Sequence, residues 1–203
     1  MAEALTDAPA NTPVVVVTGA FDCGKTTTLE WLRDRHGLRI HAEAYLSALA
    51  SLGDRKLGHP ADRGFSPIDD PEHFCPMCRP FEFAKLVLAE QAAVERRATS
   101  GDLLERGWID PIEMLLRNVG EDAPRPAWTP VASYVKVIVF AVMPELQRPR
   151  WGKSAAQRLA EVVAINQRLE AMYRAAGYEV DVVAPGSVEA RATRVLEILT
   201  KQV

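Results

Sequence analysis

Residues 13–28 read Pro13-Val-Val-Val-Val-Thr18-Gly19-Ala-Phe-Asp-Cys-Gly24-Lys25-Thr-Thr-Thr28. The β-branched run 13–18 has no polar alternation, which is typical of a strand buried on both faces of a parallel sheet. The run stops at Gly19, and residues 25–35 have helical spacing, followed by a predicted left-handed cap at Gly37. A strand, a glycine-containing loop and a helix in this order form the first unit of an α/β domain.

Strands and helices alternate along the rest of the chain. Strands are predicted over residues 13–18, 38–42, 102–106, 134–143 and 178–183, and helices over 25–35, 44–52, 81–99, 111–118, 154–176 and 188–200, the last capped by Ser187. This alternation indicates a parallel sheet with helices on both faces. We therefore expect a three-layer α/β fold with a central, mostly parallel five-stranded sheet.

A single domain accounts for the whole pattern. Residues 1–12 are expected to be a disordered tail, and residues 13–203 one domain without internal repeats. Residues 53–80 contain many prolines and glycines and predict an unusually long loop or lid. A second proline-rich stretch, 121–130, predicts a solvent-exposed linker.

Composition excludes several classes of protein. The chain has 203 residues with 24 basic and 27 acidic side chains, a formal net charge of −3, so it lacks the basic field of a dedicated nucleic-acid binder. Its longest apolar run, 135–143, is interrupted by Lys136 and is about half of what a membrane helix needs. Three cysteines are too few for a secreted disulfide framework and favour a reducing cytoplasm. Neither a nucleic-acid nor a membrane partner is expected, and the oligomeric state stays open.

The segment from Gly19 to Thr26 matches the phosphate-loop pattern of glycine, four residues, then Gly-Lys-Ser/Thr. Its position between a strand and a helix is the one that phosphate binding requires, because backbone N–H groups and the helix N-terminus attract anions. Lys25 is expected to reach the β- and γ-phosphates, Thr26 to bind Mg²⁺, and Thr27 to lie at the α-phosphate. The predicted nucleotide-binding residues are Gly19, Ala20, Phe21, Asp22, Cys23, Gly24, Lys25, Thr26 and Thr27, with Pro185 and Gly186 where a nucleotide base would pack.

Two residues inside this loop have open roles. The Asp22 carboxylate would repel phosphate unless it points toward Mg²⁺, a base or the acceptor. Cys23 is either a reactive thiol, since a helix N-terminus lowers a thiol pKa, or a small residue that fills space, which we favour.

Four charged residues are candidates for chemistry at the ends of the second and third strands. Glu105 is expected to hold Mg²⁺ directly or through water, the alternative being a surface charge at a strand end. Arg106 can pair with phosphate or acceptor, and Asp110 is either a base or a helix N-cap before Pro111. Glu43 follows the second strand and is a candidate general base for an acceptor hydroxyl.

A basic segment follows the fourth strand. Arg148, Arg150 and Lys153 lie in it, and Arg158 lies on the next predicted helix. Such a segment could close over a triphosphate and neutralise charge that develops during transfer. The alternative is a solvated basic turn.

A Cys-x-x-Cys pair lies in the long predicted loop. His73, Cys75 and Cys78, together with His59, could just supply the four ligands that zinc prefers. A redox pair is the less favoured reading because the motif does not adjoin a βαβ start. Buried or acceptor-facing thiols are the default expectation.

These motifs carry a family resemblance. The chain resembles the P-loop kinase branch of nucleoside triphosphatases, more narrowly an AAA-type ATPase/kinase family similar to the kinase domain of ribosylnicotinamide kinase, from Val14 to Leu199. The segments 18–27, 41–44, 104–110 and 166–178 carry it, and Glu105-Arg-Gly-Trp-Ile-Asp110 stands where the family has Asp-Arg-Gly-x-x-Asp. The 147–150 segment departs from the family's lid pattern. The resemblance implies a Mg²⁺-dependent nucleotide site at Lys25, Thr26 and Glu105, and ATP rather than GTP.

The function expected from the sequence is therefore that of an ATP- and Mg²⁺-dependent phosphotransferase acting on a small-molecule acceptor. The alternatives are a regulatory switch that hydrolyses ATP or GTP and binds a macromolecular partner, and a metal or redox sensor gated by Cys75 and Cys78. No Asn-Lys-x-Asp guanine-reading motif occurs in the chain.

Overall fold

The computed structural model describes residues 12–51, 79–150 and 152–200. The predicted tail, apart from Thr12, lies outside these residues, as does the predicted loop 53–80, apart from Arg79 and Pro80. His59, His73, Cys75 and Cys78 therefore lie outside them too.

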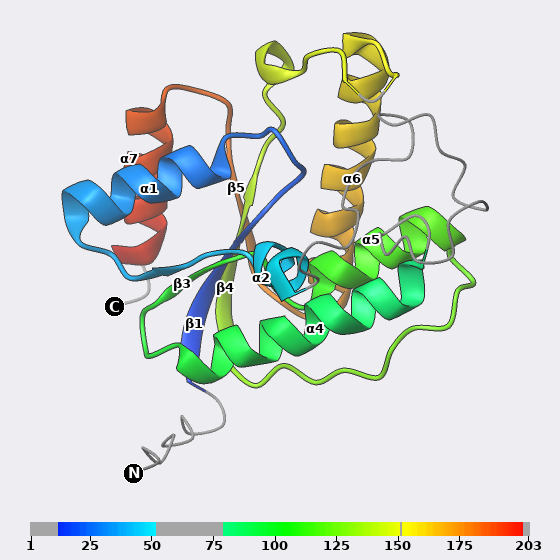
Figure 1. The fold of residues 1–203 in the computed structure, drawn as a ribbon. Helices are drawn as coiled ribbons and strands as arrows, with labels where there is room; N and C mark the ends of the chain where they lie inside the picture. The colour runs from blue at the N-terminus through cyan, green and yellow to red at the C-terminus, as the bar shows by residue number, and fades with distance from the viewer. Residues whose placement is uncertain (1–11, 52–78, 151, 201–203) are drawn as a thin grey trace.

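Five parallel strands form the central sheet, as the sequence predicted (Figure 1). Their order across the sheet is β2-β3-β1-β4-β5, with β1 in the middle, and every neighbouring pair is parallel. The strands are β1 (Pro13–Thr18), β2 (Ile40–His41), β3 (Leu103–Glu105), β4 (Ser133–Phe140) and β5 (Val180–Val183). Because all strands are parallel, the loops that follow them meet at one edge of the sheet.

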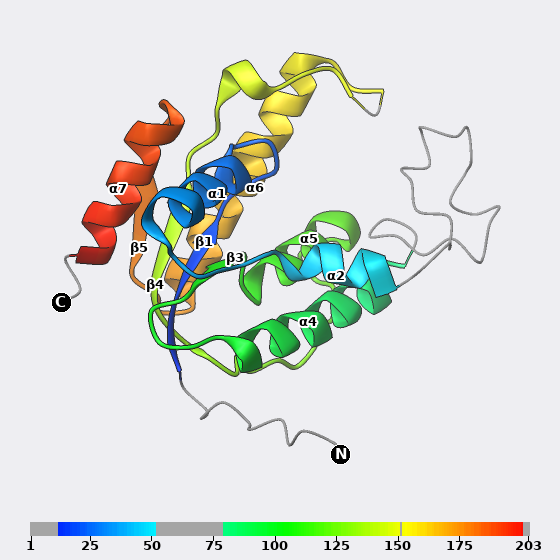
Figure 2. The same cartoon turned by 60° about the vertical axis from the view of Figure 1, so that its left-hand side comes forward.

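Alternating side chains of the strands divide the core into two halves. Val14 and Val16 of β1 face the layer formed by α2, α4, α5 and α6, whereas Val15 and Val17 face α1 and α7. Figures 1 and 2 show these helices on the two sides of the sheet, with α1 beside α7. β1 is buried on both faces, which explains its unbroken β-branched run.

Seven helices are present among the described residues, six α-helices and one short 3-10 helix, and the α-helices lie in ranges close to those predicted. They are α1 (Lys25–His36), α2 (Ala44–Ser51), α4 (Pro80–Arg97), α5 (Ile109–Val119), the short 3-10 helix η1 (Pro144–Leu146), α6 (Ala155–Ala175) and α7 (Val188–Thr200). Local signals for several ends are confirmed. Gly37 ends α1 with φ 64° and donates its N–H to the Arg33 carbonyl at 3.0 Å, and the Ser187 hydroxyl accepts from the Ala190 N–H at 3.2 Å.

Several predicted elements are shorter in the structure. The second strand was predicted over 38–42, but only Ile40 and His41 pair with β3, because β3 itself has three residues. The third strand ends at Glu105 because Arg106 turns out of it with φ 71°. Helix α4 ends at Arg97, two residues before the predicted end, since the Asp102 carboxylate accepts from the Thr99 N–H at 2.8 Å. The fourth strand ends at Phe140 rather than Met143.

The proline-rich stretch 121–130 is irregular, as predicted, but it is not wholly solvated. Trp128 packs against the small cluster of Leu88, Ile112 and Leu116. The segment that follows is fixed by buried Glu95 of α4, whose Oε2 accepts from the N–H groups of Val131 (2.6 Å) and Ala132 (3.2 Å). A buried carboxylate therefore ties this connection to the helical layer.

No helix among the described residues is long and apolar enough to cross a membrane.

Candidate nucleotide and phosphoryl-transfer site

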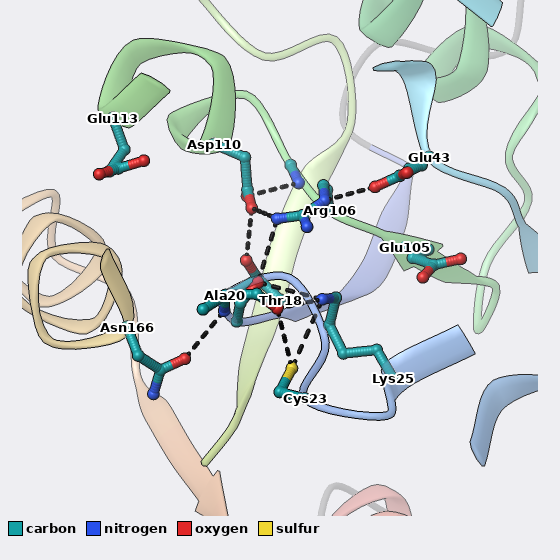
Figure 3. A network of polar contacts seen from close by, with 12 residues as sticks. Thr18, Ala20, Cys23, Lys25, Glu43, Glu105, Arg106, Asp110, Glu113 and Asn166 are labelled. Atoms are coloured by element: carbon teal, nitrogen blue, oxygen red, sulfur yellow. Dashed lines mark hydrogen bonds and ion pairs between the residues drawn. The ribbon is translucent and has the colours of Figure 1, made fainter. Parts of the chain in front are cut away.

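The phosphate loop, residues 19–26, leaves the central strand and enters α1 (Figure 3). Gly19 has φ 139°, and a Cβ at this position would lie 2.7 Å from the Phe140 carbonyl oxygen, so another residue would be strained and would clash with backbone. The loop is held from both sides. The Ala20 N–H donates to Asn166 Oδ1 at 3.0 Å, and Arg191 Nη1 donates to the Cys23 carbonyl at 2.9 Å.

Lys25 is the first residue of α1 and is 5% exposed. Its Nζ donates to the carbonyls of Gly19 (3.1 Å) and Ala20 (2.7 Å). Burial, and then the positive charge of Arg106, lower the pKa of Lys25 from its ordinary value. A negatively charged ligand at the loop would attract the Lys25 ammonium group and so oppose the effects of burial and of Arg106 on its pKa. Electrostatics therefore favour phosphate binding by Lys25.

Thr26 and Glu105 place two oxygen atoms together beside the start of α1. Thr26 Oγ1 donates to Glu105 Oε1 at 2.6 Å, and the Glu105 side chain is buried. Burial raises the pKa of Glu105, although the hydrogen bond from Thr26 lowers it in part. The alternative expectation, a surface charge at a strand end, is therefore wrong. A hydroxyl and a carboxylate are hard oxygen ligands of the kind that Mg²⁺ prefers.

Arg106 joins the ends of two strands to the phosphate loop (Figure 3). Its Nε donates to Glu43 Oε2 at 2.5 Å, and its Nη1 donates both to Asp110 Oδ1 at 2.8 Å and to the Gly19 carbonyl at 3.0 Å. Burial lowers the pKa of Arg106, but the carboxylates of Glu43 and Asp110 outweigh burial and raise it. The guanidinium thus stays charged and fixes Glu43 at the edge of the loop.

The Asp110 carboxylate accepts four hydrogen bonds. Its Oδ1 accepts from Thr18 Oγ1 (2.6 Å) and from Arg106, and its Oδ2 accepts from the Gly107 N–H (3.1 Å) and from Tyr173 Oη (2.8 Å). The N-cap expectation is wrong, because α5 begins at Ile109 and Asp110 lies in its first turn. Because both oxygens accept hydrogen bonds, the carboxylate holds Thr18, Arg106 and Tyr173 in place. Its role as a base stays a prediction.

The match to known proteins agrees with this geometry. A family model described as AAA domain, AAA_28, matches residues 14–191. The chain belongs to this AAA-domain family.

Several solved structures are similar to this AAA-domain protein. It is similar to a deoxyadenosine kinase from M. mycoides solved with bound dATP, with 13% identity, a TM-score of 0.56, and coverage of 92% of this chain and 99% of the kinase. It is also similar to a shikimate kinase from Bacteroides thetaiotaomicron, with 12% identity, a TM-score of 0.52, and coverage of 93% and 98%. At these identities the likeness shows the fold, that of P-loop kinases. A search of curated protein sequences found no match.

Arg158, one of the four basic residues named from the sequence, contacts the phosphate loop, and so does Gln147, which was not predicted. Arg158 of α6 is 1% exposed, and its Nη2 donates to Asp22 Oδ2 at 2.7 Å while its guanidinium lies 4.3 Å from the centre of the Phe21 ring. Gln147 Nε2 donates to the Asp22 carbonyl at 3.0 Å. Asp22 itself has φ 54°, so these contacts hold a strained turn.

The two arginines predicted to form a lid, Arg148 and Arg150, are exposed, and Arg150 forms an antiparallel bridge with Lys153. Their role over a triphosphate stays a prediction. Lys153 Nζ pairs with Glu161 at 3.0 Å.

The remaining predicted site residues have mixed outcomes. Thr27 is exposed in the first turn of α1, and Pro185 and Gly186 are exposed between β5 and α7, at the same sheet edge as the phosphate loop. Their contacts with a nucleotide stay predictions. Cys23 is 1% exposed and its Sγ lies 3.0 Å from the Ala20 carbonyl, which supports a residue that fills space.

The zinc hypothesis is not tested, because His73, Cys75 and Cys78 are outside the described residues. Among the residues that are described, no group of three or more His, Cys, Asp or Glu side chains is arranged to hold a metal ion. Thr26 and Glu105 offer only two side-chain ligands. This number suits a cation such as Mg²⁺, which completes its coordination shell with phosphate oxygens and water.

Sequence reasoning missed the contributions of Tyr173, Asn166 and Arg191. Tyr173 and Asn166 lie on α6 and Arg191 on α7, far along the chain from the phosphate loop. Asn166 and Tyr173 are seven residues apart, which is about two helical turns, so they share one face of α6. This spacing can be seen in the sequence, but a tyrosine at such a position is usually an ordinary core residue, so the spacing alone does not assign Tyr173 to the site.

Proposed function

We propose that this protein is an ATP- and Mg²⁺-dependent kinase that transfers a phosphoryl group to a hydroxyl of a small molecule. The observation that carries the proposal is the placement of Glu43 beside the phosphate loop. Arg106 binds both Glu43 Oε2 and the Gly19 carbonyl, so the carboxylate lies next to the loop that would hold the phosphates.

Glu43 is the candidate general base. Arg106 occupies its Oε2, whereas its Oε1 has no hydrogen-bond partner within residues 12–51, 79–150 and 152–200. The side chain is 19% exposed, so an acceptor hydroxyl can approach it. In the proposed step, the acceptor oxygen bonds to the γ-phosphorus, the bond from that phosphorus to the bridging oxygen of ADP breaks, and Glu43 takes the hydroxyl proton.

The donor side fits a Mg²⁺–nucleotide complex. The loop presents Lys25 and the first turn of α1, and Thr26 and Glu105 would hold Mg²⁺ through oxygen atoms that already lie 2.6 Å apart. When bound, Mg²⁺ would neutralise negative charge on the phosphate oxygens. Lys25 would bind the β- and γ-phosphates, and Arg106 would keep Glu43 oriented toward the acceptor.

The acceptor is proposed only as a class. The similar structures are described as kinases of a deoxynucleoside and of shikimate, both of them small molecules with hydroxyl groups. The sequence resemblance to the kinase domain of ribosylnicotinamide kinase adds a third hydroxyl-bearing compound. We therefore infer a small hydroxyl acceptor and a cytoplasmic site of action, with ATP as donor.

The test is ADP release by the purified protein with Mg-ATP, alone and with deoxyadenosine, deoxycytidine, shikimate or nicotinamide riboside. Stimulation by one acceptor, with the phosphorylated product seen by mass spectrometry, is the expected result. Glu43→Gln should lower the stimulated rate by about 100-fold or more, within the range expected for a general base. Glu30→Gln, an exposed glutamate on α1, is the matched control and should keep the wild-type rate.

Lys25→Ala provides the blank for contaminating kinases. Slow ADP release that no small molecule stimulates, and that a protein partner accelerates, would refute the kinase proposal and favour a nucleotide-hydrolysing switch. A rate unchanged by Glu43→Gln would refute the role of Glu43 as base while leaving a kinase possible through another group.

A further inference from the structure

A buried tyrosine lies behind the Arg106–Glu43 pair. Tyr173 of α6 is 0% exposed, and its Oη donates to Asp110 Oδ2 at 2.8 Å. Burial, followed by the negative charge of Asp110, raises the pKa of Tyr173 well above its ordinary value. The hydroxyl therefore keeps its proton, so it remains a hydrogen-bond donor to the carboxylate.

Asp110 transmits this contact to Arg106. Its other oxygen accepts from Arg106 Nη1 at 2.8 Å, and Arg106 Nε donates to Glu43 at 2.5 Å. The direction of each hydrogen bond is fixed, because an arginine only donates and an ionised carboxylate only accepts. The guanidinium is thus held between two carboxylates, one of which is anchored by Tyr173.

Tyr173 also packs against the turn that carries Arg106. Arg106 has φ 71°, a conformation that costs free energy in a non-glycine residue and persists only when its surroundings hold it. A Cβ added to the next residue, Gly107, would lie 2.6 Å from Tyr173 Oη. The Gly107 N–H donates to the same Asp110 oxygen that binds Tyr173.

We propose that Tyr173 is a positioning residue which, through Asp110, holds Arg106 in the orientation that presents Glu43 to the acceptor. Its consequence for catalysis rests on the proposed function, but its effect on Arg106 does not. The same helix binds the phosphate loop through Asn166, so α6 contacts both the loop and the Arg106 turn.

The first measurement is made without substrate. The Arg106 Nε–H resonance, assigned by its loss in Arg106→Lys, is followed by NMR for exchange with water in Tyr173→Phe. We expect exchange about tenfold faster than in the wild-type protein, the change that corresponds to losing one hydrogen bond to a charged group. Asp110→Asn, which breaks the same link from the other side, should have the same effect.

Tyr178→Phe is the matched control. The Tyr178 ring lies 5.9 Å from that of Tyr173, and its hydroxyl accepts from Trp108 Nε1 at 3.2 Å rather than binding Asp110. It should leave the exchange of Arg106 unchanged. Equal exchange rates in the wild-type protein and in both Tyr173→Phe and Asp110→Asn would overturn the proposal.

The second measurement uses the acceptor that stimulates ADP release in the panel above. Tyr173→Phe should lower kcat about tenfold with an unchanged KM for Mg-ATP, and Tyr178→Phe should change neither. A kcat equal to that of Tyr178→Phe would overturn the positioning role. If no acceptor stimulates the wild-type protein but Tyr173→Phe still accelerates exchange at Arg106, the kinase proposal fails and the positioning of Arg106 by Tyr173 stands.

Discussion

Replacing Gly107 by alanine tests how tightly the tyrosines pack behind the site. A Cβ at this position would lie 2.6 Å from Tyr173 Oη and 2.8 Å from Tyr134 Cε2. Both tyrosines are buried, and the backbone of Gly107 is outside the positive-φ region, so the effect is steric. To make room, one of the two rings must move and weaken the hydrogen bond of its hydroxyl to Asp110 or to the Trp108 N–H.

The structure sets the size of the effect. Overpacking a buried site costs about 1–3 kcal/mol, and losing a hydrogen bond to a charged group costs about 1.5–3 kcal/mol. The lower entropy of the unfolded chain with alanine returns about 0.4–1 kcal/mol. We expect a net loss of about 3 kcal/mol in the free energy of unfolding, or a fall in Tm of about 6–12 °C for a chain of this size.

The assay is urea unfolding followed by circular dichroism, with Gly186→Ala as the control. A Cβ at Gly186 would have its nearest neighbour at 3.8 Å, so this change should cost less than about 0.5 kcal/mol. Tyr173→Phe removes the atom nearest to the new methyl group. The double variant Gly107→Ala/Tyr173→Phe should therefore lose about 1 kcal/mol less free energy of unfolding than the sum of the losses in the two single variants. Wild-type stability of Gly107→Ala, or strict additivity in the double variant, would refute the packing argument.

Three further outcomes are expected. Lys25→Ala should weaken Mg-ATP binding about 100-fold by calorimetry while the circular dichroism spectrum stays native, because a charge-assisted contact with phosphate is lost; unchanged affinity would contradict the phosphate-loop assignment. Asp22→Asn should strengthen Mg-ATP binding about fivefold, because it removes a negative charge from the loop and the carboxylate that pairs with Arg158; weaker binding would show that Asp22 serves the nucleotide. Although burial acts in the opposite direction, the hydrogen bond with His41 holds the pKa of Asp102 below its ordinary value. Because its pKa is lower in the folded state, ionised Asp102 stabilises the folded protein. This stabilisation is present above the pKa of about 3.9 that an aspartate has in the unfolded chain, and it is lost as pH falls through the lower pKa of Asp102 in the folded state. Asp102→Asn should therefore be less stable than the wild-type protein in urea at pH 7, with a difference that shrinks toward pH 3.

Local sequence signals predicted most of the fold. The strand at residues 13–18 and the helix at 188–200 have the predicted bounds, because an unbroken β-branched run and a serine cap act within a few residues. The errors fall where a distant group intervenes. Helix α4 ends early because Asp102 binds Thr99, and β2 is short because its partner strand is short.

The candidate site was predicted in part. The phosphate-loop pattern identified Lys25 and Thr26 by spacing alone, since loop and helix are contiguous. Glu43 and Glu105 were placed by the rule that parallel strands bring their carboxyl ends to one edge. The rule gives the edge but not the partners, so it left Asp110 open between a base and a helix cap.

The sequence by itself determined the alternation of strands and helices and the phosphate loop, because these depend on neighbours along the chain. Only the tertiary structure decided the strand order, the contact of Arg106 with Glu43 across 63 positions, and the contact of Tyr173 with Asp110 across another 63. It also selected Arg158 as the arginine that binds Asp22. The Arg106–Glu43 contact depends on the pairing of β2 with β3, whereas the contacts of Tyr173 and Arg158 depend on how α6 is rotated against the sheet. Both the pairing and the rotation are set by packing of the whole core rather than by any local pattern.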